Sequence, residues 1–237
     1  MAPRGALPGL AQRESGVGTH AEAVDSERGG WPPELGVRQV NVDSVDEVGR
    51  LQRIASECGR EVDCVVRLQL GYEELLREDP SFESTMRVWE GKFGSSTANG
   101  AAGEVVERLL EAPNLNFVGL SHHVGFAGVA ADYTREREVM HHRLCARDIA
   151  AFASSLPVPC ERLDLGGGFR SGDSVYLASP GGGGEDAAVH ELPSIDDHAE
   201  AIVDELSVVY PDPSARPCCS SSPVATRSRM RRCCSHA

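Results

Sequence analysis

Three consecutive glycines directly follow a short apolar run, and they form the first candidate site. Gly166, Gly167 and Gly168 come after the segment RLDL at 162–165. Glycine adopts positive φ without strain and lets backbone N–H groups converge on an anion, so such a turn suits a phosphate. A tight strand-to-helix turn with no ligand is the alternative. A dinucleotide-binding G-x-G-x-x-G fingerprint is excluded, because position 171 is serine.

A pair of histidines forms the second candidate site, in the segment SHHVG at 121–125. Side chains alternate along a strand, so only one of His122 and His123 can face a ligand. An imidazole there can stack on a flat ligand, bind a metal or transfer a proton, or it can simply be a hydrogen-bonded residue at a barrel rim. Ser121 is not a nucleophile elbow, since G-x-S-x-G would require glycine at position 123.

No metal site is expected. His141 and His142 follow within a long amphipathic segment, and we expect them on its outer turns. The adjacent pairs Cys218–Cys219 and Cys233–Cys234 lack the spacing of zinc ligands. Lys92, in GKFG at 91–94, is the only lysine of the chain, and a lysine in a loop is usually solvated.

Apolar periodicity predicts the elements that position these residues. Strands are expected at 36–42, 62–70, 116–124 and 162–165, and they alternate with helices that begin near Ser44, at 100–112, at 133–156 and near Ser194. On the first two of these helices the expected inward positions are Val48, Leu51, Ile54, Ala55, Cys58, Val105, Val106, Leu109 and Leu110. Such alternation predicts an α/β protein with parallel strands, either a doubly wound sheet or part of a (β/α)8 barrel. In both, ligands bind beyond the carboxyl ends of the strands.

Composition sets the domain boundaries and the class of partner. We expect residues 1–33 to be disordered, 34–213 to form the β/α domain and 214–237 to be a disordered, basic tail rich in Cys, Arg and Ser. The net charge of −13 argues against nucleic acid. No apolar run suits a membrane span or a signal peptide, and the cysteines in apolar segments are expected to be reduced, which predicts a cytoplasmic protein.

Five segments in order carry a resemblance to a family. VNVDSVDEVGRL (40–51), VVRLQL (65–70), GKFG (91–94), GLSHHVG (119–125) and LDLGGGF (163–169) resemble the fold-type III, pyridoxal-phosphate-dependent amino acid decarboxylases, which include the ornithine, diaminopimelate and arginine enzymes. The resemblance implies an incomplete (β/α)8 (TIM) barrel of the alanine-racemase-like type. About four of its eight strands would be present in this chain.

The resemblance also implies a cofactor site. Pyridoxal 5′-phosphate would have its phosphate wrapped by Gly166, Gly167 and Gly168 together with Gly125, and its pyridine ring stacked on His123. HVG and GGGF favour the ornithine type, of polyamine biosynthesis, and the diaminopimelate type, of lysine biosynthesis, is the alternative. The family implies a small amino acid substrate and allows a homodimer. Phe126 stands where the family has a serine phosphate ligand.

Two departures from the family bear on activity. The lysine that holds the cofactor as a Schiff base lies upstream of D-S-x-x-E-L in the family, whereas no lysine precedes Lys92 here, and Lys92 occupies the K-F-G position. The family's E-P-G-R strand has no counterpart. We therefore expect a partial chain with no catalytic residue of its own, inactive alone. A non-enzymatic protein resembling antizyme inhibitor, and a different phosphate-binding barrel such as an isomerase, are the alternatives.

Overall fold

A parallel β-sheet organises the part of the chain that the structure describes. The computed structural model describes residues 17–20, 37–83, 93–123, 134–167, 169 and 193–220. Its strands are β1 (Val17–His20), β2 (Val37–Val42), β3 (Val62–Gln69), β4 (Ser95–Ser96), β5 (Leu115–Ser121), β6 (Arg162–Asp164) and β7 (Cys218–Ser220). All pair in parallel, as expected for β/α units.

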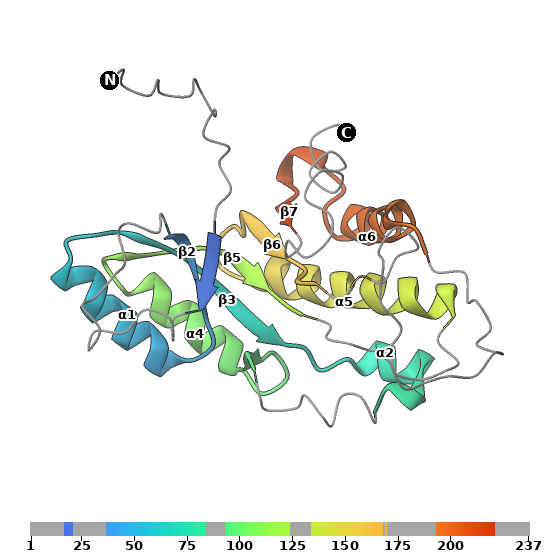
Figure 1. The fold of residues 1–237 in the computed structure, drawn as a ribbon, viewed down its shortest axis with the longest axis horizontal. Coiled ribbons are helices and arrows are strands. Elements are labelled where there is room, and N and C mark those ends of the chain that lie inside the picture. Colours follow the sequence, from blue (N-terminus) through green and yellow to red (C-terminus); the bar gives the residue numbers. More distant parts are fainter. Residues whose placement is uncertain are drawn as a thin grey trace, which may run out of the picture.

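Strand order decides between the two architectures that the sequence left open. The sheet runs β1-β2-β3-β5-β6-β7, with the short β4 attached to β3 (Figure 1). Apart from that branch, every strand lies beside the next one along the chain, and the order never reverses within the described residues. A doubly wound sheet requires such a reversal, whereas a (β/α)8 barrel is wound in one direction. The described residues therefore form part of a barrel.

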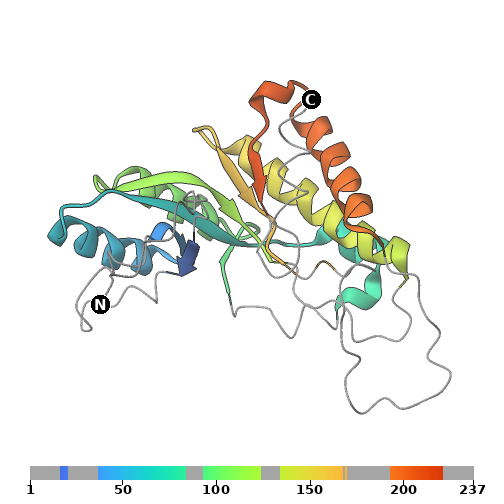
Figure 2. The same cartoon turned by 45° about the horizontal axis from the view of Figure 1, so that its top comes forward.

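Helices connect the strands, and all but the short α2 lie at the positions that periodicity predicts. They are α1 (Val45–Glu57), α2 (Glu73–Glu78), α4 (Ala101–Leu110), α5 (Arg135–Ser155) and α6 (Ile195–Val209), with 3-10 turns at Pro80–Phe82 and Pro213–Ala215. α1 packs beside α4, and α5 packs beside α6. Figure 2 shows these two helix pairs at opposite ends of the sheet. The second pair covers the end of the sheet where the glycine turn lies.

Local sequence signals explain where α1 and α6 begin. Ser44 caps α1, because its hydroxyl accepts a hydrogen bond from the Glu47 backbone N–H across 3.3 Å. The Glu47 carboxylate in turn accepts a hydrogen bond from the N–H of Asp43 at 2.6 Å. In a standard capping box the donor would be the N–H of the next residue, Ser44. Ser194 and Asp197 form the complete capping box at α6. These caps satisfy N–H groups that the first helical turn leaves unpaired.

Two of the predicted inward positions are wrong. Val48, Leu51, Ile54 and Ala55 of α1 are buried as expected, as are the α4 positions 105, 106 and 109. Cys58, however, is exposed, because α1 ends at the preceding residue and the chain turns away there. Leu110 is 45% exposed, since it follows Leu109 by one position and so points about 100° away from the buried face.

The sheet extends further at both edges than the sequence indicates. Cys218–Ser220 lie in the segment expected to be disordered, yet they pair with β6, and the Cys219 side chain joins the hydrophobic core. Val17–His20, also in a segment expected to be disordered, pair with β2. A three-residue strand with one buried side chain has too little periodicity to be detected. The rest of 1–33 and residues 221–237 lie outside the described residues.

Two further properties bear on the sequence expectations. No helix among the described residues has the length and apolar character needed to cross a bilayer. The six described cysteines are all free thiols, with Cys64, Cys145 and Cys219 buried in the core.

Candidate functional site

The carboxyl ends of β2, β3, β5 and β6 bring separate sequence motifs to one edge of the sheet. Asp43 follows β2, Arg67 lies near the end of β3, His122 and His123 follow β5, and Gly166 follows β6 by two residues. Ligands of parallel β/α proteins bind at this edge. The arrangement therefore brings together the histidine pair and the glycine turn, which the sequence singled out, with Asp43 and Arg67, which it did not.

The two adjacent histidines have different environments. His122 is 4% exposed; its Nδ1 donates to the Leu68 carbonyl at 3.1 Å, and its Nε2 accepts from the Tyr72 hydroxyl at 2.9 Å. Burial lowers the pKa of His122 to about 4, so the ring is neutral at pH 7. His123 is exposed, and its Nδ1 accepts a hydrogen bond from the Gly167 backbone N–H at 2.9 Å. Only His123 faces the glycine turn, in agreement with the expected alternation.

The turn after β6 requires glycine where it meets the histidines. Gly166 has φ +71°, and a Cβ there would lie 2.5 Å from the carbonyl oxygen of His122 and 2.7 Å from Nδ1 of His123. Its backbone N–H donates to Oδ1 of Asp164 at 2.9 Å, which fixes the turn. Of the other predicted site residues, Gly125 and Gly168 lie outside the described residues, as do Lys92 and Phe126.

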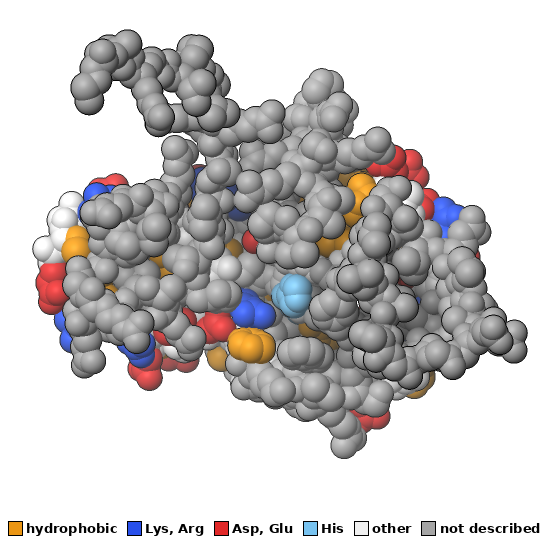
Figure 3. Space-filling view, in the orientation of Figure 1, with side chains coloured by type: hydrophobic (Ala, Val, Ile, Leu, Met, Phe, Trp, Pro, Cys, Tyr) orange, Lys and Arg blue, Asp and Glu red, His pale blue; other side chains and the backbone are white. Residues whose placement is uncertain are grey.

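The electrostatics of the site favour a neutral imidazole beside a cation. Because the Gly167 N–H points at Nδ1, the ring proton of His123 resides on Nε2. Partial desolvation of the ring by the surrounding residues lowers the pKa of His123, and the nearby Arg67 guanidinium lowers it further. Arg67 in turn lies over the Phe93 ring, 4.6 Å from its centroid. Figure 3 shows one face of the molecule with an exposed imidazole beside a basic and an apolar side chain, the three kinds of group that these residues supply.

Asp43 is a functional candidate that sequence reasoning missed. Its Oδ2 accepts from the Gly94 N–H at 3.0 Å, and its carbonyl accepts from the Ser95 hydroxyl at 2.6 Å. It thereby ties the segment after Phe93 to the end of β2. Its position directly after a predicted strand was the signal that could have identified it.

The predicted exposure of His141 and His142 is wrong. His141 is fully buried, with Nε2 2.8 Å from Oδ2 of Asp79, and His142 is 4% exposed. α5 packs against α2 on one side and against α6 on another, so more of its circumference is buried than an apolar stripe indicates. Hydrogen bonds from Arg137, Ser81 and His141 outweigh the effect of burial and hold the pKa of Asp79 at about 2.

Comparison with known proteins decides the family. The family model described as "Pyridoxal-dependent decarboxylase, pyridoxal binding domain" matches residues 33–202. This chain belongs to the pyridoxal-dependent decarboxylases. Membership implies pyridoxal 5′-phosphate as the cofactor, and it confirms the resemblance drawn from the five motifs.

Relatives of this decarboxylase chain are diaminopimelate decarboxylases. The enzyme of Actinosynnema pretiosum is 38% identical over 136 residues, which cover 56% of this chain and 27% of the relative. That of Mycobacterium bovis is 37% identical over 136 residues, covering 56% of this chain and 29% of the relative. They agree better with the diaminopimelate alternative than with the ornithine type that HVG and GGGF favoured. The chain thus spans under a third of the length of these relatives.

A solved structure confirms the fold. The diaminopimelate decarboxylase of M. jannaschii superimposes with a TM-score of 0.62 at 22% identity, covering 80% of this chain and 38% of that one. This similarity supports the partial barrel that strand order indicates.

The described residues fit pyridoxal phosphate. Without a Cβ, Gly166 lets the turn approach the two histidines closely, because a Cβ there would collide with the His122 carbonyl oxygen and with Nδ1 of His123. Beside this turn lie the exposed, neutral imidazole of His123 and the positive charge of Arg67. An aromatic ring and a phosphate dianion are the two parts of the cofactor that such groups bind.

Proposed function

We propose that this decarboxylase chain binds pyridoxal phosphate through the glycine turn 166–168 and Gly125, which hold the phosphate, while His123 covers one face of the pyridine ring. The observation that carries the proposal is the hydrogen bond from the Gly167 N–H to Nδ1 of His123. This bond joins the glycine turn, to which the family resemblance assigns the phosphate, to His123, to which it assigns the pyridine ring. The positive φ and crowded Cβ position of Gly166 support the same assignment.

Each residue then has a physical task. The Gly167 N–H orients the imidazole and keeps its proton on Nε2, so the ring is neutral and its flat face stays available. Arg67 offsets part of the phosphate charge through the field it exerts at this edge. Asp43 holds the segment after Phe93 against β2 and so limits how far this side of the site can open. When bound, pyridoxal phosphate supplies an electron sink for the electron pair that a departing carboxylate leaves on the substrate.

We further propose that the parent enzyme acts on a diamino dicarboxylic acid of the diaminopimelate type, because the curated relatives carry that name. The single lysine of the sequence, Lys92, stands at the K-F-G position of the family pattern and not at the position of the family's Schiff-base lysine. We therefore expect the chain to bind the cofactor without a covalent bond. We also expect it to release no CO2 from diaminopimelate on its own. A homodimer and a cytoplasmic location stay predictions. Light scattering on the purified chain would measure its mass and so test for the homodimer.

Equilibrium dialysis with pyridoxal phosphate tests the proposal. The wild-type chain should bind one cofactor per chain. Inorganic phosphate should compete with pyridoxal phosphate for the site. His123→Ala should weaken binding about tenfold or more, because it removes both the ring face and the acceptor for Gly167. Gly103→Ala, in a helix position with open space around it, is the matched control and should bind like wild type. Equal affinities of the His123→Ala and wild-type chains would overturn the proposal.

A further inference from the structure

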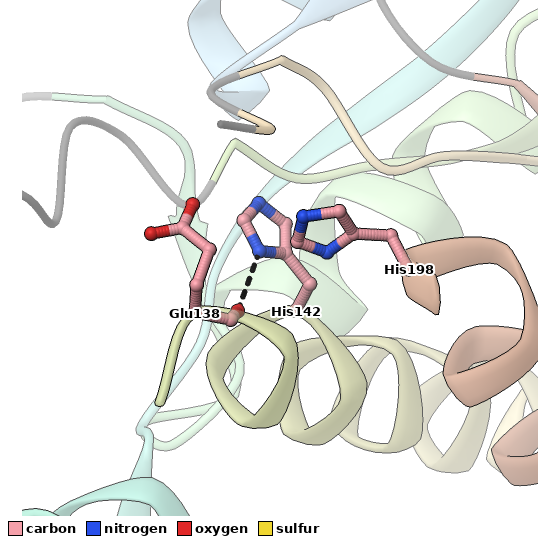
Figure 4. Close-up of side chains that lie close together, drawn as sticks. All are labelled: Glu138, His142 and His198. Carbon is pink, nitrogen blue, oxygen red and sulfur yellow. Dashed lines mark hydrogen bonds between the residues drawn. The ribbon is translucent and has the colours of Figure 1, made fainter. Parts of the chain in front are cut away.

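Two helices bring together three buried side chains that the cofactor site does not use. Glu138 and His142 lie one turn apart on α5, and His198 lies in the first turn of α6. One ligand atom from each lies within 4.8 Å of the other two. The three side chains are 2%, 4% and 0% exposed, respectively. Figure 4 shows His142 between Glu138 and His198.

The ring of His142 is oriented so that one nitrogen lacks a hydrogen bond. Its Nδ1 donates to the backbone carbonyl of Glu138 at 3.0 Å, so its Nε2 carries a lone pair. That Nε2 is buried and has no hydrogen-bond partner among the described residues. A buried polar atom without a partner costs free energy, and coordination to a cation would remove that cost. The hydrogen bond at Nδ1 is also the second contact that metal-binding histidines usually make to fix their tautomer.

The donor set specifies the class of cation. Two imidazole nitrogens and one carboxylate oxygen suit Zn²⁺ and related first-row ions, whereas Mg²⁺ and Ca²⁺ prefer oxygen ligands alone. A tetrahedral Zn²⁺ about 2.1 Å from each ligand needs ligand atoms about 3.4 Å apart. The side chains would therefore close in by about an ångström on binding. The carboxylate also supplies a negative charge that the cation would neutralise in this buried place.

We propose that Glu138, His142 and His198 form a structural binding site for a Zn²⁺-class cation that ties α5 to α6. The three side chains would fill three positions of a tetrahedral ion, and a water molecule would take the fourth. We assign a structural role because the ligands are buried and one wall of the site is apolar. The Phe169 ring stacks on His142 with centroids 4.2 Å apart, and it meets His198 edge-on at 5.3 Å. Phe169 follows the glycine turn directly, so the bound cation would also stabilise the packing behind that turn.

In the test, the full chain is first stripped of metal with a chelator and is then incubated with Zn²⁺. The wild type should retain one Zn²⁺ per chain after gel filtration, and its melting temperature should rise with added Zn²⁺. His142→Phe keeps the stack on Phe169 but removes the ligand, and Glu138→Gln changes one carboxylate to an amide. Both should weaken Zn²⁺ binding by about tenfold or more. Glu136→Gln, exposed on the same helical turn, should bind like wild type.

Cobalt substitution separates this site from binding by cysteines. Co²⁺ bound here should show visible bands of tetrahedral intensity without the near-ultraviolet charge-transfer band of thiolate ligands, and Glu138→Gln should remove these bands. If His142→Phe does not fold, as judged by circular dichroism, Glu138→Gln decides. The proposal is wrong if the folded wild type retains no Zn²⁺. It is equally wrong if Glu138→Gln binds as tightly as wild type, or if Co²⁺ shows thiolate ligation.

Discussion

The backbone N–H of Gly167 donates to Nδ1 of His123 across 2.9 Å, and the two residues are 44 positions apart in the chain. This bond joins the ends of β5 and β6, which pair from Gly119–Arg162 to Ser121–Asp164. It also fixes the tautomer of an exposed imidazole. A flat, neutral ring held at a glycine turn is the arrangement on which the proposed function rests.

Replacing Gly166 by alanine should disturb both the fold and the site. The new Cβ would collide with the His122 carbonyl and the His123 ring, and alanine is strained at φ +71°. We expect Gly166→Ala to lower the free energy of unfolding by about 2 kcal/mol and to weaken pyridoxal phosphate binding. Urea unfolding and dialysis measure the two effects.

Gly103→Ala serves as the control for this prediction. Gly103 lies inside α4, and its Cβ would meet open space. Alanine should therefore raise the free energy of unfolding, by about 1 kcal/mol, through helix propensity. If Gly166→Ala proved as harmless as Gly103→Ala, the described turn geometry would be incorrect.

Stability should fall as the solution is acidified, in part because His122 is buried in its neutral form. Its folded pKa of about 4 lies below the unfolded value of about 6.5, so below pH 6.5 the unfolded state binds more protons. Its contribution to stability is complete above pH 6.5 and is lost progressively towards pH 4. His122→Asn should flatten the dependence of unfolding free energy on pH by about 1.4 kcal/mol per pH unit in that range. Identical slopes for the two proteins would show that His122 is not buried as described.

Arg147 should stabilise the packing of α5 against α2 and α6. It makes two hydrogen bonds to Glu205, at 2.7 and 2.6 Å, and one to Glu74, at 2.6 Å. The Glu205 side chain is only 8% exposed, so Arg147→Met would leave a nearly buried carboxylate with less compensation. We expect a loss of about 2 kcal/mol, less than for a fully buried pair because Arg147 is partly solvated.

The exposed pair Arg108–Glu111 provides the matched comparison for Arg147. Its side chains are 57% and 69% exposed. Arg108→Met should change the unfolding free energy by less than about 0.5 kcal/mol, because water screens the pair. Thermal unfolding of both variants gives the comparison, and equal losses would contradict the role assigned to Arg147.

The main elements could be predicted because their signals are local. The run at 62–70 and the caps at Ser44 and Ser194 depend on neighbouring residues alone, and β3, α1 and α6 formed as expected. β7 could not be predicted, because Cys218–Ser220 become a strand only by pairing with β6, far away in the sequence. Its single buried side chain, Cys219, gives no periodic pattern.

The candidate site was predictable to a similar degree. Alternation predicted that only one of His122 and His123 can face a ligand, and in the structure only the His123 ring accepts a hydrogen bond from the glycine turn. The burial of His141 could not be predicted, because it depends on Asp79, 62 residues away, and on the packing of α2 and α6 against α5. Asp43 was missed because its role appears only when β2 and the segment after Phe93 are brought together.

The central claim is that the Gly166–Gly167 turn and His123 together bind pyridoxal phosphate. The most direct measurement is the nuclear magnetic resonance shift of the Gly167 amide and of the His123 ring during titration with pyridoxal phosphate. Both signals should move together and saturate at one equivalent, because the amide and the ring share a hydrogen bond. Binding of the cofactor with both signals unmoved would contradict the claim.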